Sequence, residues 1–159
     1  MIPQELSEKL KAKFGNAIIE AKMDGVLDPY LKVTPEKIRE VSHFMRDSEE
    51  MRFDLLMCLS GMDYGNGKLG VVYHLNSTKW NHKLTLKVEV PLDNPHVPSV
   101  ESVWKTANWH EREAFDLIGI VFDGHPDLRR ILLPDDWEGH PLRKDYHVPE
   151  YYNGMKVPY

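Results

Sequence analysis

Hydrophobic residues recur at helical spacing in two segments of the first half of the chain. The first segment predicts a helix over residues 3–14, with apolar residues at Leu6, Leu10 and Phe14. The second predicts a helix that begins at Thr34-Pro35 and runs to Arg46, because Thr is a common N-cap and Pro fits the first helical turn. Its buried face would consist of Ile38, Val41 and Met45.

Five further segments predict β-strands, at residues 17–23, 26–33, 53–59, 69–75 and 84–90. The last of them alternates apolar and polar residues, which is typical of a strand with one exposed face. Pro29 lacks the N–H that strand pairing needs, so the second strand is expected at a sheet edge. The third is mostly apolar and is expected to be buried. The order α-β-β-α-β-β-β predicts an α+β fold: a two-layer α-β(2)-α-β(3) scaffold over residues 1–92, with helices on one face of a mixed sheet.

The remainder of the chain, residues 93–159, follows a different pattern. Short helices are predicted at residues 99–105 and 108–118, the second with Asn108 as its N-cap, followed by a short apolar strand at residues 119–122. Prolines recur beyond this strand and exclude a long helix, so we expect an extended C-terminal arm. Both parts are expected to belong to a single domain, residues 1–159.

Composition narrows the classes of function. The chain is 42% hydrophobic and 28% charged, with a net charge of -5 and scattered basic residues, so nucleic acid is not expected as a partner. The single cysteine, Cys58, excludes an internal disulfide framework and a self-contained iron–sulfur site. The sequence has no apolar run long enough for a membrane span, and its N-terminus lacks the regions of a signal peptide. We therefore expect a cytoplasmic protein that contacts a membrane only through partners.

The predicted helix at residues 108–118 carries an acidic residue on its apolar side. A helical wheel places Glu111 among the apolar residues. The opposite face carries Trp109, Arg112, Glu113 and Asp116, and Arg112 and Asp116 can pair there. A carboxylate on an apolar face is either a catalytic acid with a raised pKa or one half of a buried ion pair. We favour the ion pair, because three arginines that can each bind both carboxylate oxygens follow: Arg129, Arg130 and Arg143.

Other catalytic and metal-binding patterns are incomplete. His110-Glu111 begins like a metalloprotease motif, but Ala114 stands where the second histidine is needed. The chain has no Gly-rich phosphate loop and no nucleophile elbow, and Cys58 lies in an apolar run that predicts a buried, inert thiol. The spacing needed for zinc is also absent from His125, His140 and His147. We therefore predict no catalytic, metal-binding or cofactor-binding residue in this chain.

Aromatic residues and arginine are interleaved with acidic residues from residue 111 onward, which is the composition of a protein–protein interface. This segment either wraps its own scaffold or binds a partner, and one extended arm can do both. The candidates for ion pairing and subunit docking are Glu111, Arg112, Glu113, Asp116, His125, Arg129, Arg130, Trp137, Arg143, Lys144, Asp145 and Tyr146.

Three motifs in this segment resemble the thirty-kilodalton subunit family of respiratory complex I, the C-subunit in bacteria. They are EREAFDLIGI at Glu111–Ile120, GHPDLRRIL at Gly124–Leu132 and WEGHPLRKDY at Trp137–Tyr146. The sequence departs from the family at Ile118, where many members have an aromatic residue. It departs again at His147-Val148, which separates the last motif from the proline that often follows it.

The resemblance implies a peripheral-arm subunit of a proton-pumping NADH:quinone oxidoreductase, on the cytoplasmic side of the cell membrane. Such a subunit carries no cofactor, and flavin and iron–sulfur clusters are expected in its partner subunits. It docks onto the quinone-site subunit (the D-subunit) and neighbouring cluster-bearing subunits, and it supports electron transfer from NADH to quinone. Because the sequence stops at Tyr159, the form that is not fused to the quinone-site subunit is expected. Two alternatives stay open: the equivalent subunit of a membrane-bound hydrogenase or related dehydrogenase complex, and a small hydrolase that uses Glu111 and a histidine.

Overall fold

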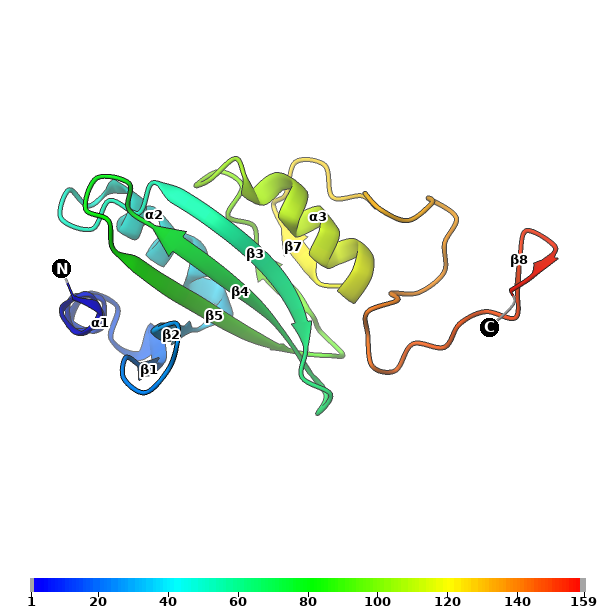
Figure 1. Ribbon diagram of the computed structural model, residues 1–159, viewed down its shortest axis with the longest axis horizontal. Coiled ribbons are helices and arrows are strands. Elements are labelled where there is room, and N and C mark those ends of the chain that lie inside the picture. The colour runs from blue at the N-terminus through cyan, green and yellow to red at the C-terminus, as the bar shows by residue number, and fades with distance from the viewer. Residues whose placement is uncertain (1, 158–159) are drawn as a thin grey trace.

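The computed structural model describes residues 2–157, which form an α+β scaffold followed by an extended arm (Figure 1). The helical elements are α1 (Pro3–Phe14), η1 (Gly15–Ala17), η2 (Pro35–Lys37), α2 (Ile38–Asp47) and α3 (Ala107–Ile118). The main strands are β1 (Ile18–Lys22), β2 (Tyr30–Val33), β3 (Leu55–Asp63), β4 (Lys68–Asn76) and β5 (Lys83–Pro91). The short strands are β6 (His96–Pro98), β7 (Val121–Asp123), β8 (Tyr151–Tyr152) and β9 (Met155–Lys156).

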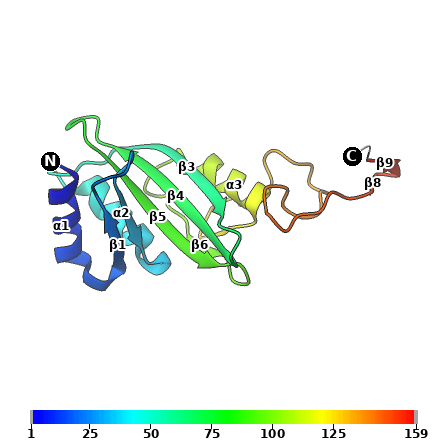
Figure 2. The same cartoon turned by 60° about the horizontal axis from the view of Figure 1, so that its bottom comes forward.

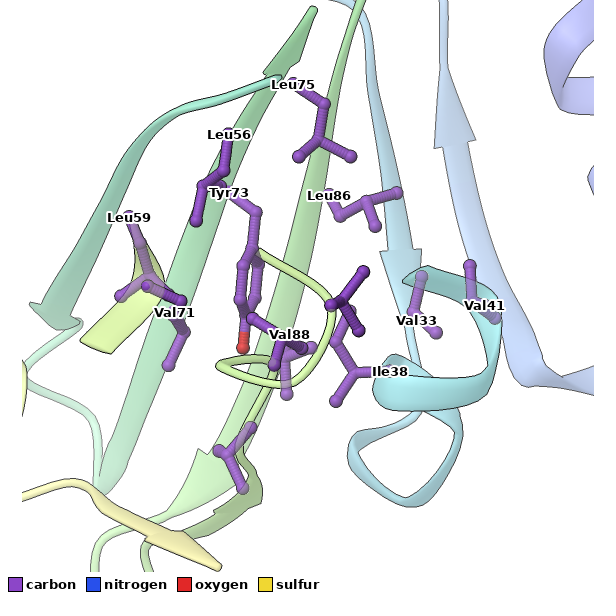
Figure 3. Close-up of a cluster of buried hydrophobic side chains, with 14 of the residues drawn as sticks. Val33, Ile38, Val41, Leu56, Leu59, Val71, Tyr73, Leu75, Leu86 and Val88 are labelled. Atoms are coloured by element: carbon purple, nitrogen blue, oxygen red, sulfur yellow. The ribbon is translucent and has the colours of Figure 1, made fainter. Parts of the chain in front are cut away.

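The five main strands form one mixed sheet in the order β1-β2-β5-β4-β3. Strands β2 and β5 run parallel, and the other neighbours run antiparallel. One face of this sheet packs against the helices, and Figure 3 shows Leu86 and Val88 of the sheet on the side of Ile38 and Val41 of α2. All four side chains are fully buried in one continuous core. The predicted fold class, with helices on one face of a mixed sheet, is confirmed.

Two predictions about the sheet were wrong. Strand β2 is an interior strand between β1 and β5, because Pro29 lies just before it and needs no N–H in the ladder. The Pro29 carbonyl still accepts a hydrogen bond from the Thr85 amide at 3.0 Å. Strand β3, predicted to be buried, is an outer strand: Leu56 is buried, but Met57 next to it is exposed.

The helix boundaries also differ in part from the prediction. The helix at residues 3–14 is confirmed, whereas Thr34 precedes a 3₁₀ turn, makes no side-chain cap hydrogen bond, and α2 begins only at Ile38. Residues 99–105 form turns instead of a helix. Helix α3 begins at Ala107, so Asn108 lies inside the helix and is not its N-cap.

Beyond α3 the chain forms β7, which pairs parallel with β6. A strand after α3 is confirmed, but it spans Val121–Asp123 and not the predicted residues 119–122, because Gly119 caps the helix. Residues 124–157, here named the C-terminal arm, contain only the β8–β9 hairpin as regular structure. Figure 2 shows this arm running away from the sheet and the three helices. So little regular structure means that the arm needs another source of order, since its backbone groups are not paired in a helix or sheet.

Candidate functional site

The site is built on α3, which packs closely onto strand β3. A Cβ atom added at Gly61 of β3 would lie 3.0 Å from the Cβ atom of Ala114, so a larger residue there would require α3 to shift by a few tenths of an ångström. The helix ends at Gly119, whose φ of 84° is the left-handed conformation that glycine adopts without steric cost. The position of α3 on the sheet therefore fixes where its polar side chains meet the arm.

Asp116 of α3 is the main contact between the helix and the arm. Its Oδ2 atom accepts three consecutive backbone N–H groups, from Ile131 at 3.0 Å, Leu132 at 2.8 Å and Leu133 at 2.9 Å. Its Oδ1 atom accepts a hydrogen bond from Arg130 at 2.7 Å. Burial acts to raise the pKa of this carboxyl group. The hydrogen bonds from the three backbone amides and from the Arg130 guanidinium outweigh burial and hold the pKa below its ordinary value.

Two arginines hold the arm by its backbone carbonyls. The Arg130 guanidinium donates to the carbonyls of Trp137 at 2.7 Å and Gly139 at 3.0 Å. Arg112 of α3 donates to the carbonyls of Arg129 at 3.1 Å and Arg130 at 2.9 Å. A guanidinium can satisfy several acceptors at once, so these two side chains replace the backbone pairing that the arm lacks.

Two histidines complete this contact. The His140 Nδ1 atom is 2.9 Å from the carbonyl of Asp116, and its ring lies over Gly119, where an added Cβ would be 2.7 Å from the ring. His125 Nε2 is 3.0 Å from the carbonyl of Asn108, near the other end of α3. We name the set Arg112, Asp116, Arg130 and His140 the arm anchor.

A second attachment joins the arm to the last turn of α3 and to the end of β3 with the turn that follows it. The Leu142 amide donates to the carbonyl of Leu117 at 2.9 Å, and the Lys144 amide donates to Asp63 Oδ2 at 2.8 Å. The aliphatic part of Lys144 lies against Gly65, where an added Cβ would meet it at 2.8 Å. Residues 129–144 are thus tied to the scaffold at both ends of this segment.

Glu111 is buried, but the predicted arginine partner was wrong. Its Oε2 atom accepts a hydrogen bond from the Ser99 hydroxyl at 2.5 Å, and its Oε1 atom accepts one from the Val100 amide at 2.7 Å. Burial raises the pKa of Glu111 to about 7, against these two hydrogen bonds, which act to lower it. Glu111 therefore holds residues 99–100 against α3 through neutral donors.

The predicted pairing of Arg112 with Asp116 on an exposed helix face was also wrong. Both side chains are buried, at 8% and 0% exposure, because the arm covers that face of α3. One of the three arginines considered for Glu111, Arg130, pairs with Asp116 instead. Trp109 and Glu113, predicted on the same face, do stay exposed.

The other docking candidates lie along the arm and are not gathered into one cluster. Arg129 pairs with Asp127 at 2.8 Å, and Arg143 pairs with Asp145 at 3.1 Å. Trp137 packs on Tyr152 with ring centroids 5.1 Å apart. His125 contacts the Asn108 carbonyl and Lys144 donates its amide to Asp63, as described above. The Tyr146 ring lies against Gly139.

Some residues of the site were missed in the sequence. His140 was considered as a zinc ligand and not as a contact of α3, and Ser99 was not singled out. No sequence pattern near Gly119 or His140 predicts their contact, because the two residues meet only after the arm folds back on α3. Cys58, predicted to be buried, is only partly buried, and its Sγ atom is 3.3 Å from the Ser60 hydroxyl.

Large apolar side chains are exposed on α3 and along the arm, whose backbone the anchor binds inward. Trp109 is 70% exposed and Leu132 is 63% exposed, and together with Ile131 they line a groove of about 270 Å³. Further exposed apolar side chains follow at intervals along the arm, and with this pair we name them the outer patch: Trp109, Leu132, Leu142, Val148, Tyr151 and Met155. Trp109 and Leu132 line one groove, and adjoining exposed apolar side chains of this kind mark a binding surface more often than single ones do.

Within residues 2–157, no group of three or more His, Cys, Asp or Glu side chains is arranged to hold a metal ion. Over the same residues, no helix has both the length and the apolar character that crossing a membrane requires.

The model of the family described as "Respiratory-chain NADH dehydrogenase, 30 Kd subunit" matches residues 31–152. The C-subunit of NADH-quinone oxidoreductase from Chloroherpeton thalassium is 49% identical over 159 residues, 99% of this chain and 66% of the relative. That of Chlorobium phaeobacteroides is 46% identical over 152 residues, 94% of this chain and 92% of the relative. The matched region includes α3, the arm anchor and most of the outer patch.

Two solved structures share the fold. A trypsin-resistant fragment of Nqo5 superposes with a TM-score of 0.65 at 31% identity, covering 80% of this chain and all of the fragment. A chain of an archaeal membrane-bound sulfane sulfur reductase superposes with a TM-score of 0.75 at 26% identity, covering 91% of this chain and 85% of its own. The family match, the relatives and the shared fold agree, and this chain belongs to the 30-kDa subunit family of the respiratory-chain NADH dehydrogenase, which includes the C-subunit of NADH-quinone oxidoreductase.

Proposed function

We propose that this chain is a non-catalytic peripheral-arm subunit of a proton-pumping NADH:quinone oxidoreductase. It docks onto the quinone-site subunit and neighbouring cluster-bearing subunits, and it supports electron transfer from NADH to quinone by holding those neighbours in place. The names of its relatives support the complex, since each is called a subunit of NADH-quinone oxidoreductase. Flavin and iron–sulfur clusters belong to the partner subunits in this proposal.

The observation that carries the docking role is the geometry of the arm. Its backbone is bound inward by Asp116 and Arg112, while apolar side chains such as Leu132 are exposed. An arm that only wrapped its own scaffold would bury these side chains, because exposing large apolar surface in water is unfavourable. Tyr, Trp and Leu in an ordered segment are suited to become the buried centre of an interface.

The arrangement of the acids argues against the hydrolase alternative. Asp116 has its oxygens occupied by three amides and a guanidinium, so it has no free position for a substrate or water. Glu111 is fully buried beside Ser99 and Val100 and does not line either of the grooves at α3. A general acid or base must reach the proton that it transfers, and neither carboxylate is placed to do so.

A second candidate is favoured by one structural neighbour. The archaeal sulfane sulfur reductase chain covers 91% of this chain, so the same fold also serves a respiratory membrane complex of another type. Its identity of 26% is lower than the 49% and 46% of the oxidoreductase relatives, and this difference supports the NADH-linked complex as the first candidate. In either complex, we expect the chain on the cytoplasmic side, in contact with the membrane only through its partners.

Affinity purification of the tagged chain from detergent-solubilised membranes tests the proposal. We expect the quinone-site subunit and an NADH-oxidising flavin subunit to co-purify, whereas a hydrogenase-type or sulfur-reducing complex would lack the flavin subunit. Trp109→Ser combined with Leu132→Ser removes two anchors of the outer patch and is expected to weaken retention of the quinone-site subunit by about tenfold or more.

The control is Leu27→Ser, which removes an apolar side chain that is 96% exposed in the connection between β1 and β2. This variant is expected to retain the quinone-site subunit at the wild-type level, since it lies outside the outer patch. A wild-type chain that is recovered free of every other respiratory subunit would overturn the proposal.

A further inference from the structure

Strand β3 forms an outer edge of the sheet and has a neighbour, β4, on one side only. From Leu59 to Asp63 it pairs with β4 without interruption, after a bulge between Leu56 and Cys58. Among the described residues, its backbone from Leu55 to Met62 makes no hydrogen bond outside this ladder. Every second residue of an outer strand turns its N–H and C=O groups away from the sheet, so β3 presents a row of unused donors and acceptors.

The other outer strand, β1, differs in the features that prevent pairing. It has five residues, and Glu20 and Lys22 add charges to it. Strand β3 has nine residues and neither a charge nor a proline from Leu55 to Met62. Charges and prolines are the usual means by which proteins keep an exposed edge from joining another strand. Their absence from β3 indicates an edge that is covered in the functional state.

A hollow of about 200 Å³ lies alongside this edge, between β3 and α3. Most of its lining residues are apolar, and they include Leu59, Ala114, Leu117 and Ile118. The arm closes one end, where the Leu142 amide donates to the carbonyl of Leu117. A groove between an edge strand and a helix can receive an extended peptide, which adds a strand and inserts a side chain between the two elements.

The rim of the hollow carries a negative charge. Glu113 of α3 lines it and is exposed, and within residues 2–157 it makes no ion pair. His110 lies one helical turn before it on the same rim. A basic side chain on the incoming segment would complement Glu113, and a second carboxylate there would be repelled. His110 and Glu113 line both this hollow and the groove at Trp109 and Leu132, so the two depressions are adjacent.

We propose that β3 is a docking edge: it receives an extended segment of a neighbouring subunit as a sixth strand of the sheet. One apolar side chain of that segment enters the hollow beneath α3, and a lysine or arginine of the same segment pairs with Glu113. The inference rests on the proposed function for the identity of the partner, since the segment belongs to the same complex. It adds backbone pairing along β3 to the side-chain contacts of the outer patch.

Hydrogen–deuterium exchange compares the isolated chain with the purified complex. We expect the outward amides of β3 between Cys58 and Met62 to exchange at least about tenfold more slowly in the complex, because they gain hydrogen bonds. Amides of β1, the edge strand that carries charges, are expected to exchange at the same rate in the isolated chain and in the complex. Protection of the arm without protection of β3 would overturn the docking edge and leave the proposed function intact. Protection of neither region in a chain that co-purifies with nothing would overturn both.

Two variants test the chemistry of the edge. Met62→Lys places a charge on an exposed position of β3, and Glu113→Lys reverses the charge at the rim. Each is expected to lower the yield of intact complex several-fold, with the thermal stability of the isolated chain unchanged. The matched control is Ile19→Lys, at an exposed position of β1, which is expected to assemble normally.

A second copy of the chain is the competing occupant. If the isolated wild-type chain dimerises at high concentration, with β3 protected in the dimer, and Met62→Lys restores the monomer without changing complex yield, then the edge serves self-association. That result would overturn the proposal of a partner segment. A wild-type yield for both Met62→Lys and Glu113→Lys would overturn it as well.

Discussion

Helix α3 holds two buried carboxylates that stabilise opposite parts of the molecule by opposite means. Glu111 faces the scaffold and binds the Ser99 hydroxyl and the Val100 amide, both neutral. Asp116 faces the C-terminal arm and binds the charged guanidinium of Arg130 with three amides. Both side chains are 0% exposed, so burial alone does not decide their behaviour.

The number and charge of the donors set the protonation state of each buried acid. Two neutral donors leave burial dominant at Glu111, and its pKa rises to about 7. Three amides and one guanidinium outweigh burial at Asp116, and its pKa falls below the ordinary value. The contact of Glu111 with the scaffold therefore involves a carboxyl group whose pKa is about 7. The contact of Asp116 with the arm requires the charged carboxylate.

The largest expected effect is that of Asp116→Ala. It leaves three backbone amides without an acceptor and Arg130 without its counter-charge. We therefore expect the free energy of local opening of the arm to fall by about 3 kcal/mol. Limited proteolysis at the exposed Lys144 measures this opening, and its rate should rise by about a hundredfold. Asp135→Ala removes another acid of the arm, one that is exposed, and should change the rate little. Equal proteolysis of both variants would show that Asp116 does not order the arm.

An intermediate effect is expected for Gly119→Ala, which disturbs the anchor without removing a charge. The new Cβ would meet the His140 ring at 2.7 Å in addition to the strain of a positive φ. We expect a loss of about 2 kcal/mol in the free energy of unfolding, measured by chemical denaturation. Gly25→Ala is the matched control, since Gly25 has φ 71° but no atom within 4 Å of an added Cβ. If the two variants lose the same stability, the His140 contact contributes nothing.

The smallest effect at neutral pH is expected for Glu111→Gln. The amide oxygen can accept from Val100, and the Ser99 hydroxyl can turn to accept from the amide nitrogen, so the loss should stay within about 1 kcal/mol at neutral pH. The informative measurement is its pH dependence. The folded pKa of about 7 exceeds the unfolded value of 4.5, so the folded state binds more protons between these values, and wild-type stability falls as pH rises through that window. Glu111→Gln should remove this fall, and an unchanged profile in chemical denaturation would contradict the assignment.

The pH dependence at Asp116 has the opposite sign. Its folded pKa is lowered from 3.8, so its contribution is fully present above that value and is lost as pH falls through the folded pKa. Acidification should therefore release the arm while the contact between Glu111 and residues 99–100 is retained. Limited proteolysis of the wild-type chain across the acidic range measures this release.

The sequence was sufficient for the scaffold because the local patterns there agree with the final packing. Leu6, Leu10 and Phe14 predict α1 with its observed bounds, and the alternation in β5 predicts its buried face. The errors arise where the outcome depends on how strands are arranged in the sheet, which a local pattern does not record. Pro29 interrupts no ladder because it precedes β2, and β3 is apolar although it is an outer strand.

The site was predictable only in part, because a helical wheel treats α3 as an isolated helix. The wheel correctly placed Glu111 on the apolar face and correctly left Trp109 exposed. It could not show that the arm returns to cover Arg112 and Asp116, since the hydrogen bonds of the Asp116 side chain with the arm join residues 14 to 17 positions apart. The arginine was therefore given to the wrong carboxylate.

The three hydrogen bonds from backbone amides to Asp116 affect how this surface can change through evolution. The carboxylate recognises main-chain atoms of residues 131–133, and those atoms are the same whatever side chains the residues carry. Substitutions at Leu132 can therefore alter what the outward surface recognises without loosening the segment that presents it. A gene family can in this way acquire new partners while one aspartate keeps the backbone of the contact surface in place.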